Sequence, residues 1–563
     1  MSLLLELKRR KLDRAIIVVL VIASGLLVVH KLALQSWQDP GPASAGDGGS
    51  ASHTGIPVIP AEATVQSEAG ESRNPAGTDQ QAISVAVLPF IAMSNGPDDD
   101  YFTAGLSEEI INALSQLPEL RVSVRGSAFQ FKDRNLPVGD IASQLGVQHI
   151  VEGSVKRAGE QLLITAQLLR AEDGFRLWSE SYDRRSEDTF AVQTDIAEKV
   201  AGALNVILDE NQRARMQRAG VRNVEAYTAF QKGLEYSDKA YGQDIDISLL
   251  RQGNRYFGQA ITLAPEFSDA YLEHSELFSH ILFSQANGQL EGNITPEDVK
   301  QAPAALEFDY GQAIEHAKNA GQRRVYEYDR ALLSGQWPGL ALLSERALSV
   351  PGCELAQWSQ LASAAFGQAR QLLSALERRA LCDPLSAKPW IHLVRANLWL
   401  AEPEQAVKIA ESHLQFTDHQ WLTVAYIMAL AANGRMDQAE RVNAGNLRVG
   451  SARLISGSIL AALRGDARAA AEIQDEFLGK YGPNDFITLM LEAARGQRNE
   501  ANRLASLIDR RPYGHMTLMQ AIYLCTCGIP FDLEATPVFA QMLAGSGLPW
   551  PPGKPIDFPL KDW

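Results

Sequence analysis

The stretch His149–Asp183, HIVEGSVKRAGEQLLITAQLLRAEDGFRLWSESYD, decides the fold of the first ordered part of this chain. Its short apolar runs are separated by two turns that contain Gly159 and Gly174. Glycine accepts the positive φ that tight hairpins require. The pattern therefore predicts a meander of three strands: Ile150–Arg157, Gln161–Arg170 and Phe175–Asp183.

Apolar residues alternate along the second of these strands, so one face of the sheet is expected to be buried. The residues on that face are Leu162, Ile164, Ala166 and Leu168. In the third strand Trp178 and Tyr182 share one face with Arg176 and Glu180. These aromatic residues form either an exposed binding strip or a core beneath a following helix, and aromatic burial tendencies favour the core.

The flanking segments complete an α+β domain with a mixed sheet over residues 83–208. Ile83–Phe90 is apolar on both faces, as in a central strand, and Leu120–Val124 alternates as in a half-exposed strand. A helix carries Leu106, Ile110, Leu114 and Leu117, and a short one, Asp140–Leu145, ends at Gly146. The closing amphipathic helix is expected to present Val192, Ile196, Val200, Ala203 and Ile207.

Four motifs in this part of the chain resemble the TolB-like N-terminal domain of bacterial tetratricopeptide (TPR) proteins. They are VAVLPF at 85–90, YFTAGLSEEI at 101–110, LGVQHIVEGSV at 145–155 and LWSESYD at 177–183. In that family a winged-helix DNA-binding domain or an adenylate cyclase domain often lies upstream. The resemblance implies no catalytic residue, and in this chain a predicted membrane anchor stands upstream instead.

The second half of the sequence shows an internal repeat of helical pairs. Gly434, Gly465 and Gly496 are 31 residues apart. Each is followed five positions later by an alanine, and Ala401 and Ala406 repeat this spacing one unit earlier. Glycine ends one helix, and alanine lets the next helix pack closely against it.

Residues 221–545 are therefore predicted to form a TPR-like solenoid of about eight helix pairs. Gly253, Phe257, Ala260 and Pro265 fit the second helix of a TPR unit, Tyr271 and Phe278 fit the next first helix, and Cys382–Pro384 with Trp390 looks similar. Breaks in regularity are expected at Thr295–Pro303 and Trp337–Pro338. A proline-rich tail, residues 546–563, follows.

The N-terminal part predicts a single transmembrane helix, Ala15–Leu34, because Ala15–Val29 carries no charge and apolar residues soon resume. Basic residues cluster in residues 1–14, which places this tail in the cytoplasm and the bulk of the chain in the periplasm. A cleaved signal peptide is the alternative, but no small-residue site lies close to the apolar run. Residues 35–82, rich in Gly, Ala, Ser and Pro, are expected to form a disordered linker.

Composition and motifs point away from nucleic-acid binding and from catalysis. The net charge is −15, and the one concentrated basic cluster lies beside the apolar segment. Four cysteines, Cys353, Cys382, Cys525 and Cys527, are too few for a disulfide framework. We interpret them as small buried side chains and leave open whether any of them pair. Asp98–Asp100 lacks the spacing of a calcium loop and is interpreted as an acidic helix start.

No nucleophile elbow, zinc-helix motif, phosphate loop or dinucleotide fingerprint occurs in the sequence. We therefore expect no catalytic, cofactor or metal residues, and the binding residues stay unassigned. The sequence favours a non-enzymatic scaffold in the bacterial inner membrane that binds protein or peptide partners. The alternative is a sensory or regulatory component, related to transcription or cyclic nucleotides, that acts through a separate output partner.

Overall fold

The computed structural model describes residues 83–94, 96, 98–132, 134, 136–185, 188–219, 223–241, 245–288, 293–361, 366–445, 447, 450–525 and 528–549. The predicted tail, anchor and linker before residue 83 lie outside these residues, as does most of the proline-rich tail. Among the helices of the described ranges, none combines the length and apolarity that a membrane crossing needs.

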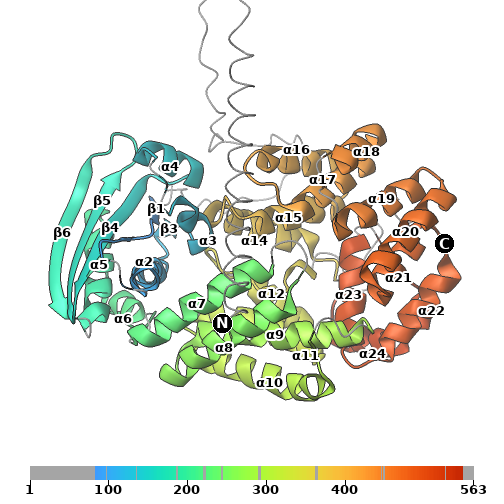
Figure 1. Ribbon diagram of the computed structural model, residues 1–563, viewed down its shortest axis with the longest axis horizontal. Coiled ribbons are helices and arrows are strands. Elements are labelled where there is room, and N and C mark those ends of the chain that lie inside the picture. The colour runs from blue at the N-terminus through green and yellow to red at the C-terminus, as the bar shows by residue number, and fades with distance from the viewer. Residues whose placement is uncertain are drawn as a thin grey trace, which may run out of the picture. The chain divides into compact units, whose positions relative to one another are not determined.

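A mixed sheet organises the first domain, as the sequence predicts (Figure 1). Its main path has the order β3-β1-β4-β5-β6, in which β1 runs parallel to β3 and β4, while β4, β5 and β6 are antiparallel. The short strand β2 pairs with β4. The bounds are β1 Ile83–Val87, β2 Ile91–Ala92, β3 Leu120–Val122, β4 His149–Ala158, β5 Gln161–Arg170 and β6 Arg176–Arg185.

The meander has the predicted turns and the predicted buried face. Gly159 and Gly174 adopt φ values of 64° and 68° in the two turns. Across β4 and β5, Val151 lies opposite Leu168 and Val155 opposite Ile164. These residues are buried, because the period of two directs them to one face of the sheet.

Helices cover the two faces of the sheet unequally (Figure 1). On the apolar face α2 (Asp99–Leu114), α5 (Thr189–Ala203) and α6 (Glu210–Ala219) pack together with the β4–β5 core. On the other face α4 (Val138–Leu145) and the 3-10 helix η1 (Phe129–Phe131) cover β1 and the start of β4. The helix α3 (Arg125–Ala128) follows β3. Within the part of the chain that the structure describes, no helix covers the middle of β4 to β6 on this second face.

The closing helix α5 is shorter than the sequence predicts. It ends at Ala203, and Asn205 then takes a left-handed φ of 61°. Ile207, which the prediction placed on the apolar face, is 91% exposed. Tyr182 is buried and its hydroxyl donates to Asp195 of α5 at 2.8 Å. Trp178 is partly buried against the same core, so both aromatic residues belong to the core.

The rest of the described chain is helical, from α7 to α24 (Figure 1). The bounds are α7 Val224–Ala240, α8 Ile247–Leu263, α9 Ser268–Ala286, α10 Pro296–Glu315, α11 Ala320–Ser334, α12 Leu340–Leu348, α14 Ala369–Cys382, α15 Ala387–Trp399, α16 Pro403–Leu414, α17 Gln420–Ala432, α18 Met436–Gly445, α19 Ser451–Leu463, α20 Ala467–Tyr481, α21 Asp485–Ala494, α22 Arg498–Asp509, α23 Gly514–Cys525, the 3-10 helix η3 Leu533–Ala535 and α24 Pro537–Ser546.

The repeat positions have one common geometry. Gly434, Gly465 and Gly496 adopt φ values of 73°, 80° and 73°, and the amide after each bonds back to a carbonyl of the preceding helix. Ala401 adopts the same conformation, with φ 60°. The alanines five positions later are fully buried, which confirms the predicted close approach of helices: Ala406, Ala439, Ala470 and Ala501.

One predicted break is wrong and the other is confirmed. Thr295 caps the start of α10 in a capping box with Asp298, and Pro303 lies inside that helix. Pro at the first helical position has no N–H to leave unsatisfied, so Pro296 starts this helix rather than breaking it. Trp337–Pro338 does separate α11 from α12, and the Trp337 side chain is buried.

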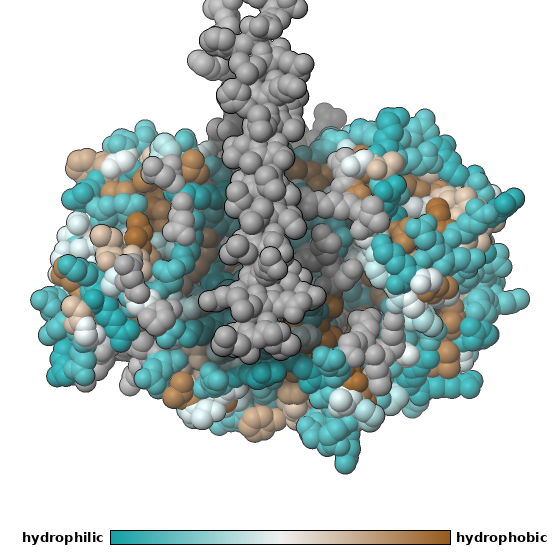
Figure 2. Space-filling view, in the orientation of Figure 1, coloured by the Kyte–Doolittle hydropathy of each residue, from teal (hydrophilic) through white to brown (hydrophobic). Residues whose placement is uncertain are grey.

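Early and late helices of this region also touch. The side chain of Arg511 donates to the carbonyl of Ala286 at the end of α9 at 3.1 Å. Thr517 of α23 donates to the Asn287 side chain at 2.9 Å. On the face shown in Figure 2, hydrophilic residues dominate the described surface and hydrophobic ones are scattered among them. Such a surface suits contact with water.

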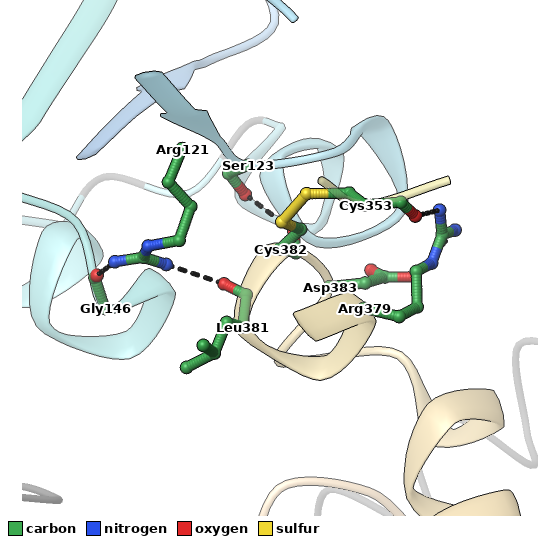
Figure 3. Close-up of a disulfide and its surroundings, with 8 residues drawn as sticks. All are labelled: Arg121, Ser123, Gly146, Cys353, Arg379, Leu381, Cys382 and Asp383. Carbon is green, nitrogen blue, oxygen red and sulfur yellow. Dashed lines mark hydrogen bonds and ion pairs between the residues drawn. A yellow bond between two sulfur atoms is a disulfide. The ribbon is translucent and has the colours of Figure 1, made fainter. Parts of the chain in front are cut away.

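A disulfide lies where the sheet domain meets the helical region (Figure 3). Cys353 and Cys382 are bonded, with Cα atoms 6.0 Å apart. The sequence left open whether these cysteines pair, because spacing alone does not show that a loop returns to the end of α14. Cys382 is buried, as expected, whereas Cys353 is half-buried. Cys525 ends α23, and the side chain of Cys525 and all of Cys527 lie outside the described part.

The segment that follows β3 binds the residues around this disulfide. The amide of Val124 donates to the carbonyl of Cys382 at 2.9 Å. The guanidinium of Arg121 donates to the carbonyl of Leu381 at 2.7 Å and to that of Gly146 in its own domain (Figure 3). The two regions thus have separate apolar cores. They are connected by these polar contacts between the segment after β3 and the turn between α14 and α15, which we call the polar joint.

Candidate binding site in the helical region

Ionisable side chains from α9 and its neighbours converge in the helical region. Tyr241 follows the last residue of α7, and its hydroxyl lies 2.7 Å from Oε2 of Glu276 and 2.8 Å from Nε2 of His280. The Nζ atom of Lys388, in the first turn of α15, lies 4.9 Å from the centre of the Tyr241 ring. The end of α7, one face of α9 and the start of α15 therefore supply one polar cluster. We call it the α9 cluster, and it consists of Tyr241, Glu273, Glu276, His280 and Lys388.

The cluster has this form because Glu273, Glu276 and His280 share one face of α9. Residues three and four positions apart are neighbours on a helix, so positions 273, 276 and 280 line up. The end of α7 brings Tyr241 against that face, and the start of α15 brings Lys388. Lys388 is exposed, whereas Glu276 is buried and Glu273 is half-buried.

Glu276 is incompletely satisfied. Its Oε2 atom accepts the Tyr241 hydrogen bond, but the buried Oε1 atom has no hydrogen-bond partner in the described part of the chain. Burial raises the pKa of Glu276, and the Tyr241 hydroxyl, the charge of Lys388 and the nearby amide side chain of Gln357 oppose that rise. Gln357 is not placed to form a regular hydrogen bond with Oε1, which has no partner among the described residues. An unpaired carboxylate oxygen in a buried setting is costly, and such groups are uncommon unless they serve a purpose.

Glu273 has no hydrogen-bond or ion-pair partner among the described residues. Burial, and then the charge of Glu276, raise the pKa of Glu273 to about 8, although Lys388 acts in the opposite direction. Burial, and then Lys388, lower the pKa of His280 to about 4. Near neutral pH the histidine is therefore uncharged, and Glu273 is poised between its two protonation states.

A second group of polar contacts joins α15 to α23. The ring Nδ1 of His392 and the hydroxyl of Tyr523 form a hydrogen bond. The guanidinium carbon of Arg395 lies 5.0 Å from the centre of the same Tyr523 ring, a cation–π contact. Burial lowers the pKa of His392 to about 3, so this histidine is also uncharged near neutral pH.

A second candidate site is a cavity of about 650 Å³ over the sheet face that lacks a covering helix. Its floor carries two cross-strand pairs: Gln167 donates to Glu152 at 2.6 Å, and the hydroxyls of Ser154 and Thr165 lie 2.7 Å apart. Phe131 contributes to an apolar wall. A polar floor within apolar walls is typical of small-molecule sites. The floor groups already satisfy one another, so the cavity gives less indication of its ligand than the α9 cluster does.

The acidic run at 98–100 lies at a helix start, as the sequence indicates. Its three carboxylates form ion pairs with three different cationic side chains. Asp98 pairs with Lys232 at 2.5 Å, Asp100 with Lys132 at 3.2 Å, and Asp99 lies 3.9 Å from Arg157. Within the residues that the structure describes, no three His, Cys, Asp or Glu side chains are grouped to hold a metal ion.

Sequence reasoning did not find the α9 cluster. The available signal was the spacing of Glu273, Glu276 and His280 on one helix face, within a segment that mixes apolar and polar residues. Tyr241 and Lys388 are distant in sequence, and only the fold brings the end of α7 and the start of α15 near this face of α9.

No protein-family model matches this chain. A stretch of 233 residues, 41% of this chain, is 33% identical to a Rhizobium meliloti (strain 1021) protein described as "Putative adenylate cyclase 3". The matched stretch spans 39% of that relative's length.

Proposed function

We propose that this chain is a non-enzymatic scaffold, anchored in the bacterial inner membrane, whose helical region binds protein or peptide partners in the periplasm. The observation that supports this most directly is the α9 cluster. It combines a buried carboxylate oxygen that has no hydrogen-bond partner within the described residues and an exposed lysine at the start of α15. Buried polar groups are normally satisfied, so the cluster is suited to receive a group from outside the chain.

The disulfide supports a location outside the cytoplasm. Bonds such as Cys353–Cys382 persist in oxidising compartments and are rare in the bacterial cytoplasm. This agrees with the basic tail at 1–14 and the apolar segment Ala15–Leu34, which favour an uncleaved anchor with a cytoplasmic N-terminus. Residues 35–82 would then act as a flexible tether.

We assign the helical region as TPR-like and the sheet domain as TolB-like. The left-handed residue between helices, the buried alanine five positions later and the 31-residue period support the first assignment. The strand and helix order of residues 83–208, together with the four motifs quoted above, supports the second.

Reporter fusions test the topology. Alkaline phosphatase fused after residue 563 should be active, because the enzyme folds only outside the cytoplasm. A cytoplasmic fluorescent reporter at the same position should stay dark. The reverse pair of results would contradict the periplasmic location. Crosslinking in intact membranes, followed by purification of the full chain, should then capture specific partners, and a matched sample with Glu276→Gln should lose those that bind the α9 cluster.

The second candidate is a sensory or regulatory component that acts through a separate output partner. The similarity to a relative whose description names an adenylate cyclase favours this alternative. It predicts that a cyclase or a DNA-binding protein copurifies with the full chain, and that cellular cyclic-nucleotide levels change when the chain is deleted. Unchanged levels, with partners that lack such activities, favour the scaffold.

A further inference from the structure

We propose that Glu273 and Glu276 on α9 form a binding site for a primary ammonium group, such as a lysine side chain of a partner. This inference rests on the proposed binding function of the helical region and names the chemistry of its ligand. The site would consist of the Glu273 carboxylate, the unpaired Oε1 atom of Glu276 and the ring of Tyr241.

The charges around the site favour a cation. Glu273 lies in the field of three other carboxylates, Glu276, Asp238 and Asp269, and of one cation, Lys388. Asp269 already binds Lys318 at 2.6 Å. Among the described residues that act on Glu273, acidic groups therefore outnumber basic ones, and an added positive charge lowers the repulsion between Glu273 and Glu276.

The Lys388 side chain shows that an ammonium group suits this environment. Its Nζ atom lies 4.9 Å from the centre of the Tyr241 ring, while the hydroxyl of that ring bonds to Glu276. An aromatic face beside carboxylates is a favourable setting for a cation. Lys388 contacts the Tyr241 ring and has no ion-pair partner among the described residues, and Oε1 of Glu276 has no hydrogen-bond partner there, so the site keeps capacity for a second ammonium. An anionic ligand would instead oppose the ionisation of the two acidic side chains, Glu273 and Glu276.

The site also has an exposed margin. Lys388 is exposed, and the side chain of Asp238 on α7 is 75% exposed. A lysine side chain is long enough to place its ammonium at a half-buried carboxylate while its backbone stays on the surface. Asp238 lies 3.8 Å from the guanidinium of Arg125 but keeps most of its carboxylate exposed, so it would still attract a basic segment toward the half-buried Glu273.

Binding of an ammonium should release a proton from Glu273 below pH 8. The charged groups that act on Glu273 are Asp238 from α7, Asp269 and Glu276 from α9, and Lys388 from α15. Tyr241 and His280 lie against the neighbouring Glu276. His280 is uncharged near neutral pH, and its titration lies well below this range. Affinity should therefore increase with pH by up to about tenfold per unit below the Glu273 pKa, the limit for one coupled proton.

The test uses the full chain in detergent micelles and three fluorescent decapeptides, which alternate glycine with lysine, glutamine or glutamate. The lysine peptide should bind at least about tenfold more tightly than the glutamine peptide, and the glutamate peptide should bind most weakly. Glu273→Gln and Glu276→Gln should remove this preference, and Glu273→Gln should also remove the pH dependence. Glu472→Gln, at an exposed glutamate of α20, is the matched control and should change neither.

A thermal melt shows whether the variants fold. Glu273→Gln should melt no lower than the unchanged chain, since it replaces a half-buried ionisable group that has no partner among the described residues with a neutral group of the same size. Competition by spermidine distinguishes the two sources of ammonium. Strong competition supports a free polyamine, and weak competition supports a lysine on a peptide.

Equal binding of the lysine and glutamine peptides would overturn the ammonium site, as would a folded Glu273→Gln variant that keeps the lysine preference. If crosslinked partners still depend on the helical region in that case, the binding function stands and only the ligand assignment fails. If the chain binds neither peptides nor partners, both fail.

Discussion

The hydroxyl of Ser127 donates a hydrogen bond of 2.8 Å to the carboxylate of Asp383, across 256 residues of sequence. The same hydroxyl oxygen accepts the amide of Leu385 at 2.9 Å. Asp383 is buried, and its other oxygen lies 3.5 Å from Arg379. One serine of the sheet domain thus satisfies two polar groups at the turn between α14 and α15, next to the disulfide.

Ser127→Ala should therefore weaken the joint between the two regions. Removal of the hydroxyl leaves the buried Asp383 carboxylate with one partner fewer, at a cost of about 1–3 kcal/mol. Urea unfolding of the region from residue 83 onward measures the loss, and hydrogen exchange locates it at 121–128 and 381–385. Ser181→Ala, at an exposed position of β6, is the control and should have little effect. Equal losses in the two variants would contradict the role of Ser127.

The disulfide should stabilise the helical region through its loop. Cys353 and Cys382 are 29 residues apart. A loop of that length corresponds to about 3–4 kcal/mol in the chain-entropy account. The double variant Cys353→Ala/Cys382→Ala should lose stability of that order in urea unfolding. Intact mass under nonreducing conditions checks the bond directly, because the oxidised chain is two hydrogens lighter than the reduced one. A reduced pair in protein purified from the periplasm would contradict the assignment.

The periodic parts of the structure could be predicted from the sequence. Alternation in Leu162–Leu168 and glycines at both turns were enough to give the meander, since these signals are local. The 31-residue spacing gave the left-handed residue between helices, and even Ala401 follows it. Thr295–Pro303 shows how a local signal can mislead, because proline starts a helix as readily as it interrupts one.

Long-range contacts could not be predicted in the same way. Nothing near Ser127 in sequence indicates Asp383, and nothing near Glu276 indicates Tyr241 or Lys388. Stacked helix pairs bring together residues that are far apart in the chain, and which side chains meet depends on the angle between successive pairs. The candidate site therefore depends on long-range contacts, about which a single sequence carries the least information.

The α9 cluster and the buried histidines should give stability a maximum near pH 6–7. Glu273 has a folded pKa of about 8 against an ordinary 4.5, so the folded state keeps a proton that the unfolded state releases. The stability that Glu273 contributes is therefore lost as pH rises from about 4.5 to about 8. His280 has the opposite sign: its folded pKa of about 4 lies below 6.5, so stability falls as pH drops through that range.

Glu273→Gln should remove the loss of stability that Glu273 causes between about pH 4.5 and 8, so stability should rise more steeply from pH 5 to 6.5 and fall less from pH 6.5 to 8.5. Chemical unfolding at pH 5, 6.5 and 8.5 measures both changes, with Glu472→Gln as the exposed control. Parallel pH curves for Glu273→Gln and the unchanged chain would show that Glu273 does not titrate in this range.

Two substitutions with opposite expected effects on stability test the repeat geometry. Ala401 and Gly465 occupy equivalent positions, with φ values of 60° and 80°. Ala401→Gly should stabilise the chain by up to about 1 kcal/mol, because glycine adopts this conformation without strain but has more freedom when unfolded. Gly465→Val should destabilise it by about 1–3 kcal/mol, since a β-branched side chain is strained there.

The cost at Gly465 is conformational, because a Cβ atom built at this position meets nothing within 4 Å. Hydrogen exchange should therefore increase in α19 and α20 in the Gly465→Val variant, while the core around Leu162–Leu168 stays protected, since the two regions have separate cores. Unchanged exchange in α19 and α20 would contradict the repeat assignment. An equal increase across β4 to β6 would instead show that the polar joint couples the two regions into one unfolding unit.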